Sequence, residues 1–131
     1  MCLDTRLLSQ YLNKKEKVKN VIEGFQQQDF DIYTTTILIS EFFMGLYNVR
    51  EPSTTELEKL KDFFLTLHPF GVDYDVSLLA GRLFARLSKG NAIGWRDTFI
   101  AAIVLQHGNI IVTSDPEHFN RVTGLNVVEY P

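Results

Sequence analysis

The sequence contains a single cysteine, Cys2, among its 131 residues. One thiol can form neither an internal disulfide nor one of the multi-thiolate zinc sites that stabilise many small proteins. A chain of this kind is typical of a reducing compartment. We therefore expect Cys2 to pack as a small apolar side chain at the start of a buried strand.

Long hydrophobic segments are missing as well. The longest apolar stretches, 37–44 and 99–105, are far shorter than the roughly 20 residues that cross a bilayer. Asp4, Arg6 and the lysines within 14–19 interrupt the N-terminal apolar residues before a secretory leader could develop. These features predict a cytoplasmic protein without a membrane span.

The chain has little excess charge of either sign. Its formal net charge is −3, so it lacks a broad positive field that would attract nucleic acid indiscriminately. Contact with RNA would have to be local, through a metal ion and a few basic side chains. Low-complexity tracts, repeats and Gly/Ser-rich linkers are also absent, and the 45% hydrophobic content predicts one domain over residues 1–131.

Short apolar stretches alternate with helical patterns along the chain. Strands separated by helices require right-handed crossovers and a parallel sheet covered on both faces. The predicted fold is therefore α/β, a three-layer α/β/α sandwich with a central, mostly parallel sheet. We predict helices over about 5–12, 16–28, 37–49, 54–67, 75–89 and 96–107, strands at 2–3, 31–35, 68–72, 109–113 and 126–130, and a helical turn at 116–119.

Three details of these helices are also predicted. Ser53 and Glu56 have the spacing of a capping box. Asp75 is expected to cap the helix that follows, and Gly90 to end it. Residues 37–49 are apolar around most of the helix circumference, which predicts burial on more than one side.

Two carboxylates lie within helices whose neighbouring residues are mostly apolar. Glu41 interrupts the apolar stretch 37–46, and Asp97 precedes the apolar residues 99–102. Burying an unpaired charge costs several kcal/mol, and no lysine or arginine lies three or four residues from Glu41 to neutralise it within its helix. A divalent cation is one partner that would remove this cost.

Two further acids are placed where predicted strands end. Asp4 follows the first strand and Asp115 follows the strand at 109–113. In parallel α/β sheets, ligands bind outside the carboxyl ends of the strands, so both residues are expected at that edge. The hydroxyls next to these acids are candidate supporting groups: Thr5, Thr113 and Ser114.

Each acid also has an ordinary structural explanation. Asp4 could cap the first helix, and Asp115 could cap a helix that has Pro116 at its first position. Asp97 could cap the helix that it begins, and Glu41 could face solvent. The shared site is favoured because the predicted topology can bring all four acids together.

A cluster of oxygen ligands without cysteine or histidine suits a hard cation. Mg²⁺ and Mn²⁺ bind through a few carboxylates and keep several waters, which leaves positions for a substrate. Such an ion can activate water, orient a phosphodiester and neutralise charge on the leaving oxygen. The predicted chemistry is phosphodiester hydrolysis. Because the titrations of close carboxylates are coupled, no single acid is assigned as the general base.

These residues make the sequence resemble the PIN-domain family, and within it the VapC-type toxins of prokaryotic toxin–antitoxin pairs. The matching pieces occur in the right order and span essentially the whole chain. They are Leu3-Asp4-Thr5, Ser40-Glu41, Asp97-Thr98-Phe99-Ile100-Ala101-Ala102, and Thr113-Ser114-Asp115 followed by His118-Phe119.

The resemblance implies an α/β/α sandwich and an endoribonuclease that needs Mg²⁺ or Mn²⁺. It also implies frequent homodimerisation and neutralisation by a small antitoxin. The resemblance implies that Thr113 is a supporting residue. Arg6 departs from the family, which usually has a small polar residue at this position, and the arginine could contact a phosphate or bridge to an acid. The residues assigned to the catalytic metal site are Asp4, Glu41, Asp97 and Asp115.

Other residues have a functional and a structural interpretation. Arg82 and Arg86 share one predicted helix face, which could guide an RNA backbone or simply face solvent. Arg96, beside Asp97, is a further candidate for RNA contact. Trp95 could stack on a base, although packing is the more common role. The three histidines are too scattered to predict a metal site, and His118 is expected to be an orienting surface residue.

The leading prediction is a VapC-like endoribonuclease that cleaves RNA with metal-activated water and is restrained by a cognate antitoxin. One alternative is a PIN-domain nuclease of RNA maturation outside any toxin pair, and another is a PIN-like binding module that has lost catalysis. A phosphoacceptor signalling domain is a further alternative, but it needs a lysine near the C-terminal strands, and none follows Lys89. A neighbouring antitoxin gene would favour the toxin.

Overall fold

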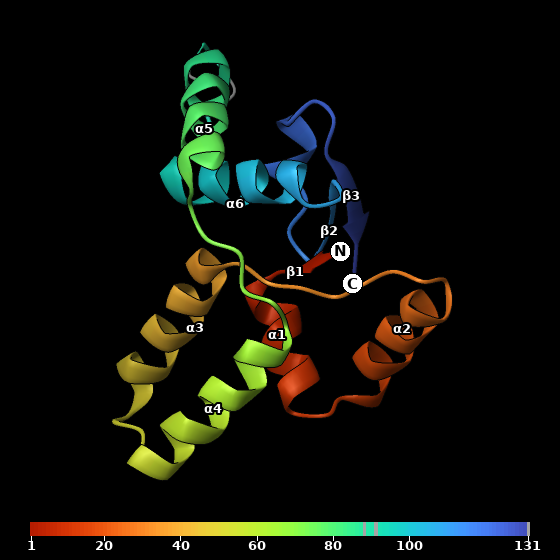
Figure 1. Ribbon diagram of the computed structural model, residues 1–131, viewed down its shortest axis with the longest axis vertical. Helices are drawn as coiled ribbons and strands as arrows, with labels where there is room; N and C mark the ends of the chain where they lie inside the picture. Colours follow the sequence, from red (N-terminus) through yellow and green to blue (C-terminus); the bar gives the residue numbers. More distant parts are fainter. Residues whose placement is uncertain (88, 91, 131) are drawn as a thin grey trace.

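The computed structural model describes residues 1–87, 89–90 and 92–130. Helices dominate this part of the chain, and the strands are short (Figure 1). The elements are β1 (Cys2–Leu3), α1 (Thr5–Leu12), α2 (Glu16–Gln27), α3 (Thr36–Val49), α4 (Thr54–Thr66), α5 (Tyr74–Leu87), α6 (Trp95–Gln106), β2 (Ile110–Thr113), the 3₁₀ helix η1 (Phe119–Arg121) and β3 (Asn126–Glu129).

The three strands form a parallel sheet in the order β1-β2-β3. In the central strand, Ile111 pairs with Cys2 on one side and with Val127 on the other. Ile111 and Val112 are buried, as expected for a parallel strand that is covered on both faces. Because all three strands run in the same direction, their carboxyl ends lie along one edge of the sheet.

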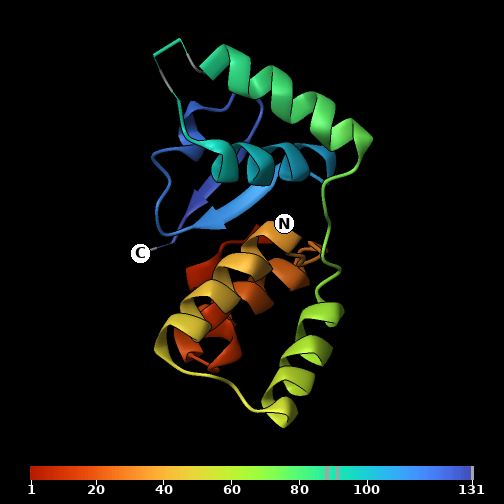
Figure 2. The same ribbon diagram turned by 90° about the vertical axis from the view of Figure 1, so that its left-hand side faces the viewer.

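Helices cover both faces of this sheet (Figure 2). α6 contacts β2 from one side, with α5 packed on the outside of α6, and α1 contacts β2 from the other side together with the N-terminal helices. The buried side chains of both halves belong to one hydrophobic cluster. This arrangement confirms the predicted α/β/α sandwich.

The strands predicted at 31–35 and 68–72 were wrong. Each segment contributes only isolated parallel bridges, from Tyr33 to Cys2 and from Thr35 to Phe70. The first segment ends because Thr35 is the N-cap of α3. In the second, His68 has a φ of 46°, which a regular strand does not tolerate.

The ends of two helices also differ from prediction. Asp73, and not Asp75, caps α5, since its carboxylate accepts a 2.8 Å hydrogen bond from the backbone N–H of Val76. This helix ends at Leu87, short of the predicted 89, and residue 88 lies outside the described part of the chain. The helical turn predicted at 116–119 is the 3₁₀ helix η1, which begins three residues later.

The capping box predicted for α4 is half correct. The hydroxyl of Ser53 accepts a hydrogen bond from the backbone N–H of Glu56 at 3.1 Å. The carboxylate of Glu56 pairs with Arg50 instead, at 2.7 Å between Nη1 and Oε2.

The burial predicted for α3 was wrong within this chain. Leu38 is its only fully buried residue in the described structure. Met44, Tyr47 and Val49 are 56%, 47% and 81% exposed. The apolar side of α3 that points away from the core therefore has no cover in the described structure.

No helix in the described part of the chain has both the length and the apolar character needed to span a membrane.

Candidate functional site

Asp4 is held at the carboxyl edge of the sheet by contacts to two elements. It follows β1 and is the N-cap of α1, where its Oδ1 accepts a 3.2 Å hydrogen bond from the backbone N–H of Leu7. Its Oδ2 accepts a hydrogen bond from the hydroxyl of Thr113, at the end of β2. The capping role considered for Asp4 is therefore correct, and the residue also faces the site described below.

Glu41 is not an unpaired charge. Arg96, near the start of α6, approaches it with 2.8 Å between Nε and Oε1, and the hydroxyl of Thr5 donates a 3.0 Å hydrogen bond to Oε2. Burial raises the pKa of the Glu41 carboxyl, whereas the Thr5 hydrogen bond and the Arg96 charge act in the opposite direction. The positive charge that neutralises Glu41 therefore comes from Arg96 on α6 and not from a residue of α3.

Asp97 lies in the first turn of α6 but does not cap it. The N-cap is Gly94, whose φ of 83° lies in the region that favours glycine. The carboxylate of Asp97 instead contacts Nδ1 of His118 at 2.7 Å from its Oδ2. The capping explanation for Asp97 was wrong, and His118 orients this carboxylate by a direct contact.

Asp115 follows β2 and lies outside any helix. The helix-capping explanation for it was wrong, because η1 begins only at Phe119 and has His118 at its N-cap position. Its backbone N–H donates a 3.0 Å hydrogen bond to the hydroxyl of Thr113. Thr113, which is buried, thereby links the backbone of Asp115 to the carboxylate of Asp4.

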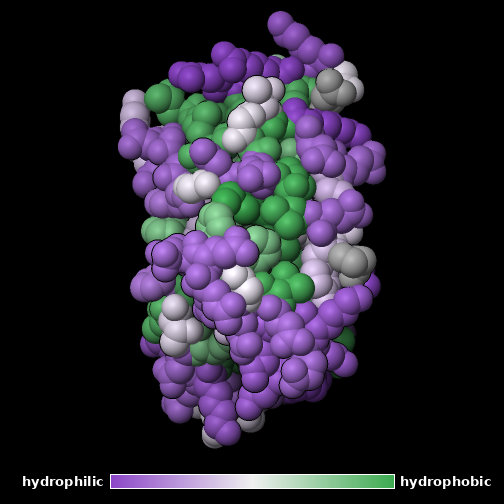
Figure 3. Space-filling model, turned by 90° about the vertical axis from the view of Figure 1, so that its right-hand side faces the viewer, coloured by the Kyte–Doolittle hydropathy of each residue, from purple (hydrophilic) through white to green (hydrophobic). Residues whose placement is uncertain are grey.

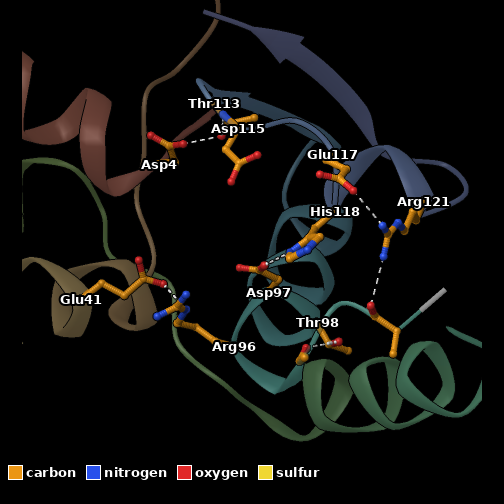
Figure 4. A network of polar contacts seen from close by, with 12 residues as sticks. Asp4, Glu41, Arg96, Asp97, Thr98, Thr113, Asp115, Glu117, His118 and Arg121 are labelled. Carbon is orange, nitrogen blue, oxygen red and sulfur yellow. Dashed lines mark hydrogen bonds and ion pairs between the residues drawn. The ribbon is translucent and has the colours of Figure 1, made fainter. Parts of the chain in front are cut away.

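The four predicted acids line one cavity of about 370 Å³ at this edge of the sheet. Figure 4 shows them arriving from separate elements and surrounding a common space. Four carboxylates face only two guanidinium groups there, so the cavity has an excess of negative charge that attracts a cation. The other lining residues are Thr5, Arg6, Leu38, Arg96, Ile100, Thr113, Ser114, His118 and Phe119.

Arg82 and Arg86 are not brought to this cavity. Both lie on α5 and line a different hollow, of about 210 Å³, together with leucines and Arg121. Trp95 packs against Phe84, with ring centroids 4.1 Å apart and planes tilted by 13°. It is nevertheless 56% exposed.

The donors in the cavity suit a hard divalent cation in kind, because they are carboxylate oxygens with neighbouring hydroxyls. Within residues 1–87, 89–90 and 92–130, no three His, Cys, Asp or Glu side chains lie close enough to hold a metal ion together. Three carboxylates are engaged by protein groups, namely Thr113, Arg96 and His118. The donor chemistry therefore fits Mg²⁺ or Mn²⁺, and binding requires the carboxylates to converge.

Two contacts of the site were missed from the sequence. Arg96 was considered as an RNA contact and not as the partner of Glu41, and His118 was not assigned to Asp97. Both partners are far apart in sequence, so helical spacing contains no signal for them. The only available hint was that a half-buried glutamate needs a cation from some other element.

Comparison with known proteins places these observations in a family. A model described as the PIN domain matches residues 1–125. No curated protein sequence gives a significant match. A similar fold occurs in the solved structure of VapBC2 from Rickettsia felis bound to a DNA fragment from their promoter, with 20% identity, a TM-score of 0.82 and coverage of 99% of this chain and 98% of that chain. VapBC-1 from nontypeable Haemophilus influenzae is 18% identical with a TM-score of 0.77, and the match covers 98% of this chain and 96% of that chain. FitAcB from Neisseria gonorrhoeae is 23% identical with a TM-score of 0.74, and the match covers 98% of this chain and 96% of that chain.

Proposed function

The chain belongs to the PIN domain family, and from this premise we propose that it is a Mg²⁺- or Mn²⁺-dependent endoribonuclease, the toxin of a VapBC-type toxin–antitoxin pair. The observation that carries the proposal is the cavity lined by Asp4, Glu41, Asp97 and Asp115. A single acid at a helix or strand end has a structural explanation. Four acids from separate elements on one concave surface are better explained by a charged ligand.

The four acids are the residues that would hold the cation. When bound, a divalent ion supplies activated water and offsets negative charge on a phosphodiester. The chain's own groups orient the ligands: Thr113 is hydrogen-bonded to Asp4, and Thr5 is hydrogen-bonded to Glu41. Such supporting contacts fix the direction of a ligating carboxylate and tune its basicity.

The basic groups on the cavity wall are the proposed contacts with RNA. Arg6 and Arg96 line the cavity, and Arg96 is 58% exposed at its side chain. Guanidinium groups bind phosphate oxygens in a bidentate manner. Since the net charge of the chain is −3, binding would depend on these local contacts. Arg82 and Arg86 would act only on RNA that extends over α5.

The proposal includes protein partners, a cognate antitoxin and a second copy of the chain, in the cytoplasm. One solved structure of similar fold is described as a toxin–antitoxin complex from Klebsiella pneumoniae, and another as a member of the VapBC family of toxin–antitoxin systems. Exposed apolar side chains on α3 and α4, including Met44, Val49 and Leu65, support an interaction surface. An apolar area bordered by hydrophilic side chains also lies on another face of the molecule (Figure 3).

RNA cleavage tests the proposed activity. Purified protein is incubated with a mixed RNA substrate in Mg²⁺, in Mn²⁺ and in excess chelator. Cleavage is expected with either metal and not with chelator. Asp97→Asn should reduce the rate by at least about 100-fold, because it removes a charged ligand while preserving shape.

Asp62→Asn is the matched control, since Asp62 is an exposed acid in α4 that does not line the cavity. It should cleave like the wild type. A folded wild-type protein that is inert in every condition would contradict the nuclease proposal and favour a binding module. Co-purification with the product of an adjacent short gene tests the toxin–antitoxin part separately.

A further inference from the structure

The contact between Arg96 and Glu41 joins the two helices that supply the cavity with Glu41 and Asp97. Glu41 comes from α3 and Arg96 from the first turn of α6, one residue before Asp97. The Glu41 side chain is 20% exposed, and that of Arg96 is 58% exposed. Figure 4 shows the Arg96 guanidinium reaching across from α6 to the carboxylate of Glu41 on α3.

This ion pair engages one of the two Glu41 oxygen atoms that a cation could bind. Arg96 Nε lies 2.8 Å from Glu41 Oε1, and Thr5 donates to Oε2. Each carboxylate oxygen of Glu41 therefore has a protein donor, but only the Arg96 donor carries a positive charge that opposes a cation. A guanidinium and a divalent cation repel each other, so both cannot sit against the same half-buried carboxylate without a large electrostatic cost.

We infer that Arg96 is a positioning residue that competes with the divalent cation for Glu41 and must release this carboxylate when the cation binds. The inference rests on the proposed function. Arg96 neutralises Glu41 in the absence of metal, which avoids an uncompensated charge in the partly buried site. This neutralisation lowers the affinity of the site for metal, because the ion pair must first be broken.

Release of Arg96 has a second consequence. A guanidinium freed from Glu41 stays at the mouth of the cavity, where an RNA phosphate would approach. Metal binding therefore makes available the same group that binds the phosphate. Binding of the metal ion and binding of the RNA phosphate therefore favour each other through Arg96.

Arg6 provides a control for the effect of charge alone. It also lines the cavity and is exposed. Among the described residues it forms no ion pair. Arg6→Gln and Arg96→Gln remove the same charge from the same cavity, but only the second breaks a contact to Glu41.

The experiment measures Mn²⁺ binding without RNA, from the electron paramagnetic resonance signal of the free ion, with folding checked by circular dichroism. Arg96→Gln should lower the Kd for Mn²⁺ roughly five-fold, the factor that corresponds to an ion pair of about 1 kcal/mol. Arg6→Gln should change it by less than about two-fold, as expected for a charge that makes no direct contact.

A spectroscopic measurement on the wild-type protein covers the case in which the variant is misfolded. In protein labelled with ¹⁵N-arginine, the Nε–H signal of Arg96 should exchange slowly with water while it is bonded to Glu41. Saturating Mg²⁺ should accelerate this exchange. Mg²⁺ binding that shifts other resonances and leaves this signal unchanged would overturn the inference.

The outcomes also separate the inference from the proposed function. If the wild type binds Mn²⁺ and Arg96→Gln binds it no more tightly than Arg6→Gln, the competition is refuted and the metal-dependent nuclease stands. If neither wild type nor variants bind Mn²⁺, both fail together. Binding by Arg96→Gln that greatly exceeds that of the wild type supports both.

Discussion

Replacement of Thr113 by valine tests whether its hydroxyl stabilises the acidic edge of the sheet. Thr113 is 1% exposed, donates to Asp4 Oδ2 and accepts from the backbone N–H of Asp115. Valine has nearly the same shape, so the substitution removes both hydrogen bonds without creating a cavity. A hydrogen bond to a charged group contributes about 1.5–3 kcal/mol, against about 1 kcal/mol for a neutral one.

Thr98→Val is a closely matched control. Thr98 is also 1% exposed, and its hydroxyl donates a 2.6 Å hydrogen bond to the neutral carbonyl of Gly94. We expect Thr113→Val to lower the free energy of unfolding by about 2 kcal/mol and Thr98→Val by about 1 kcal/mol. Asp115 is an exposed residue, so we expect water to replace the hydroxyl as the partner of its N–H and this bond to add little to the first value.

Urea unfolding without metal ions measures this difference. With an m-value of about 1–3 kcal/mol/M, a loss of 2 kcal/mol lowers the midpoint by roughly 1 M. Equal midpoints for the two variants would show that the charge on Asp4 adds nothing to the hydrogen bond. The expected extra stabilisation by the hydrogen bond from Thr113 to the Asp4 carboxylate would then be refuted.

Two further predictions concern backbone conformation and the thiol. Gly94→Ala should destabilise the protein by about 1 kcal/mol, because a side chain at its φ of 83° is strained. Gly24→Ala should stabilise the protein by about 0.5–1 kcal/mol, because Gly24 lies inside α2 and an added Cβ would meet open space. Thermal unfolding compares the two variants, and stability changes of the same sign would contradict this reasoning. Burial raises the pKa of the Cys2 thiol, and its exposure is 0%. Cys2 should therefore stay protonated and unreactive toward a thiol reagent at pH 8 until the protein is unfolded in denaturant, and rapid labelling of folded protein would disprove this.

The main elements of the fold could be predicted because their signals are local. Apolar spacing identified α2 at 16–28, where the helix spans Glu16–Gln27. It identified α6 at 96–107, where the helix spans Trp95–Gln106. Alternation of helices with short apolar strands then required a parallel sheet with helices on both faces, and the structure confirms that arrangement.

The failed predictions share a cause: each was drawn from the residue pattern within one segment, whereas strand pairing and burial depend on how that segment packs against other elements. Residues 31–35 and 68–72 have the composition of strands but pair only through isolated bridges, because a helix cap and a left-handed turn interrupt them. The apolar circumference of α3 predicted burial, yet the described chain covers only one side of it. Composition says which side chains favour burial, and the packing of other elements determines which are covered.

The sequence by itself identified the four candidate acids, and it placed Asp4 and Asp115 at one edge of the sheet because parallel strands have their carboxyl ends together. Only the tertiary structure decided how those acids are neutralised. Glu41 pairs with Arg96 and Asp97 with His118 through the packing of α6 against α3 and of the segment before η1 against α6. Helical periodicity relates residues three or four positions apart, whereas these partners are brought within 3 Å by the relative placement of whole elements.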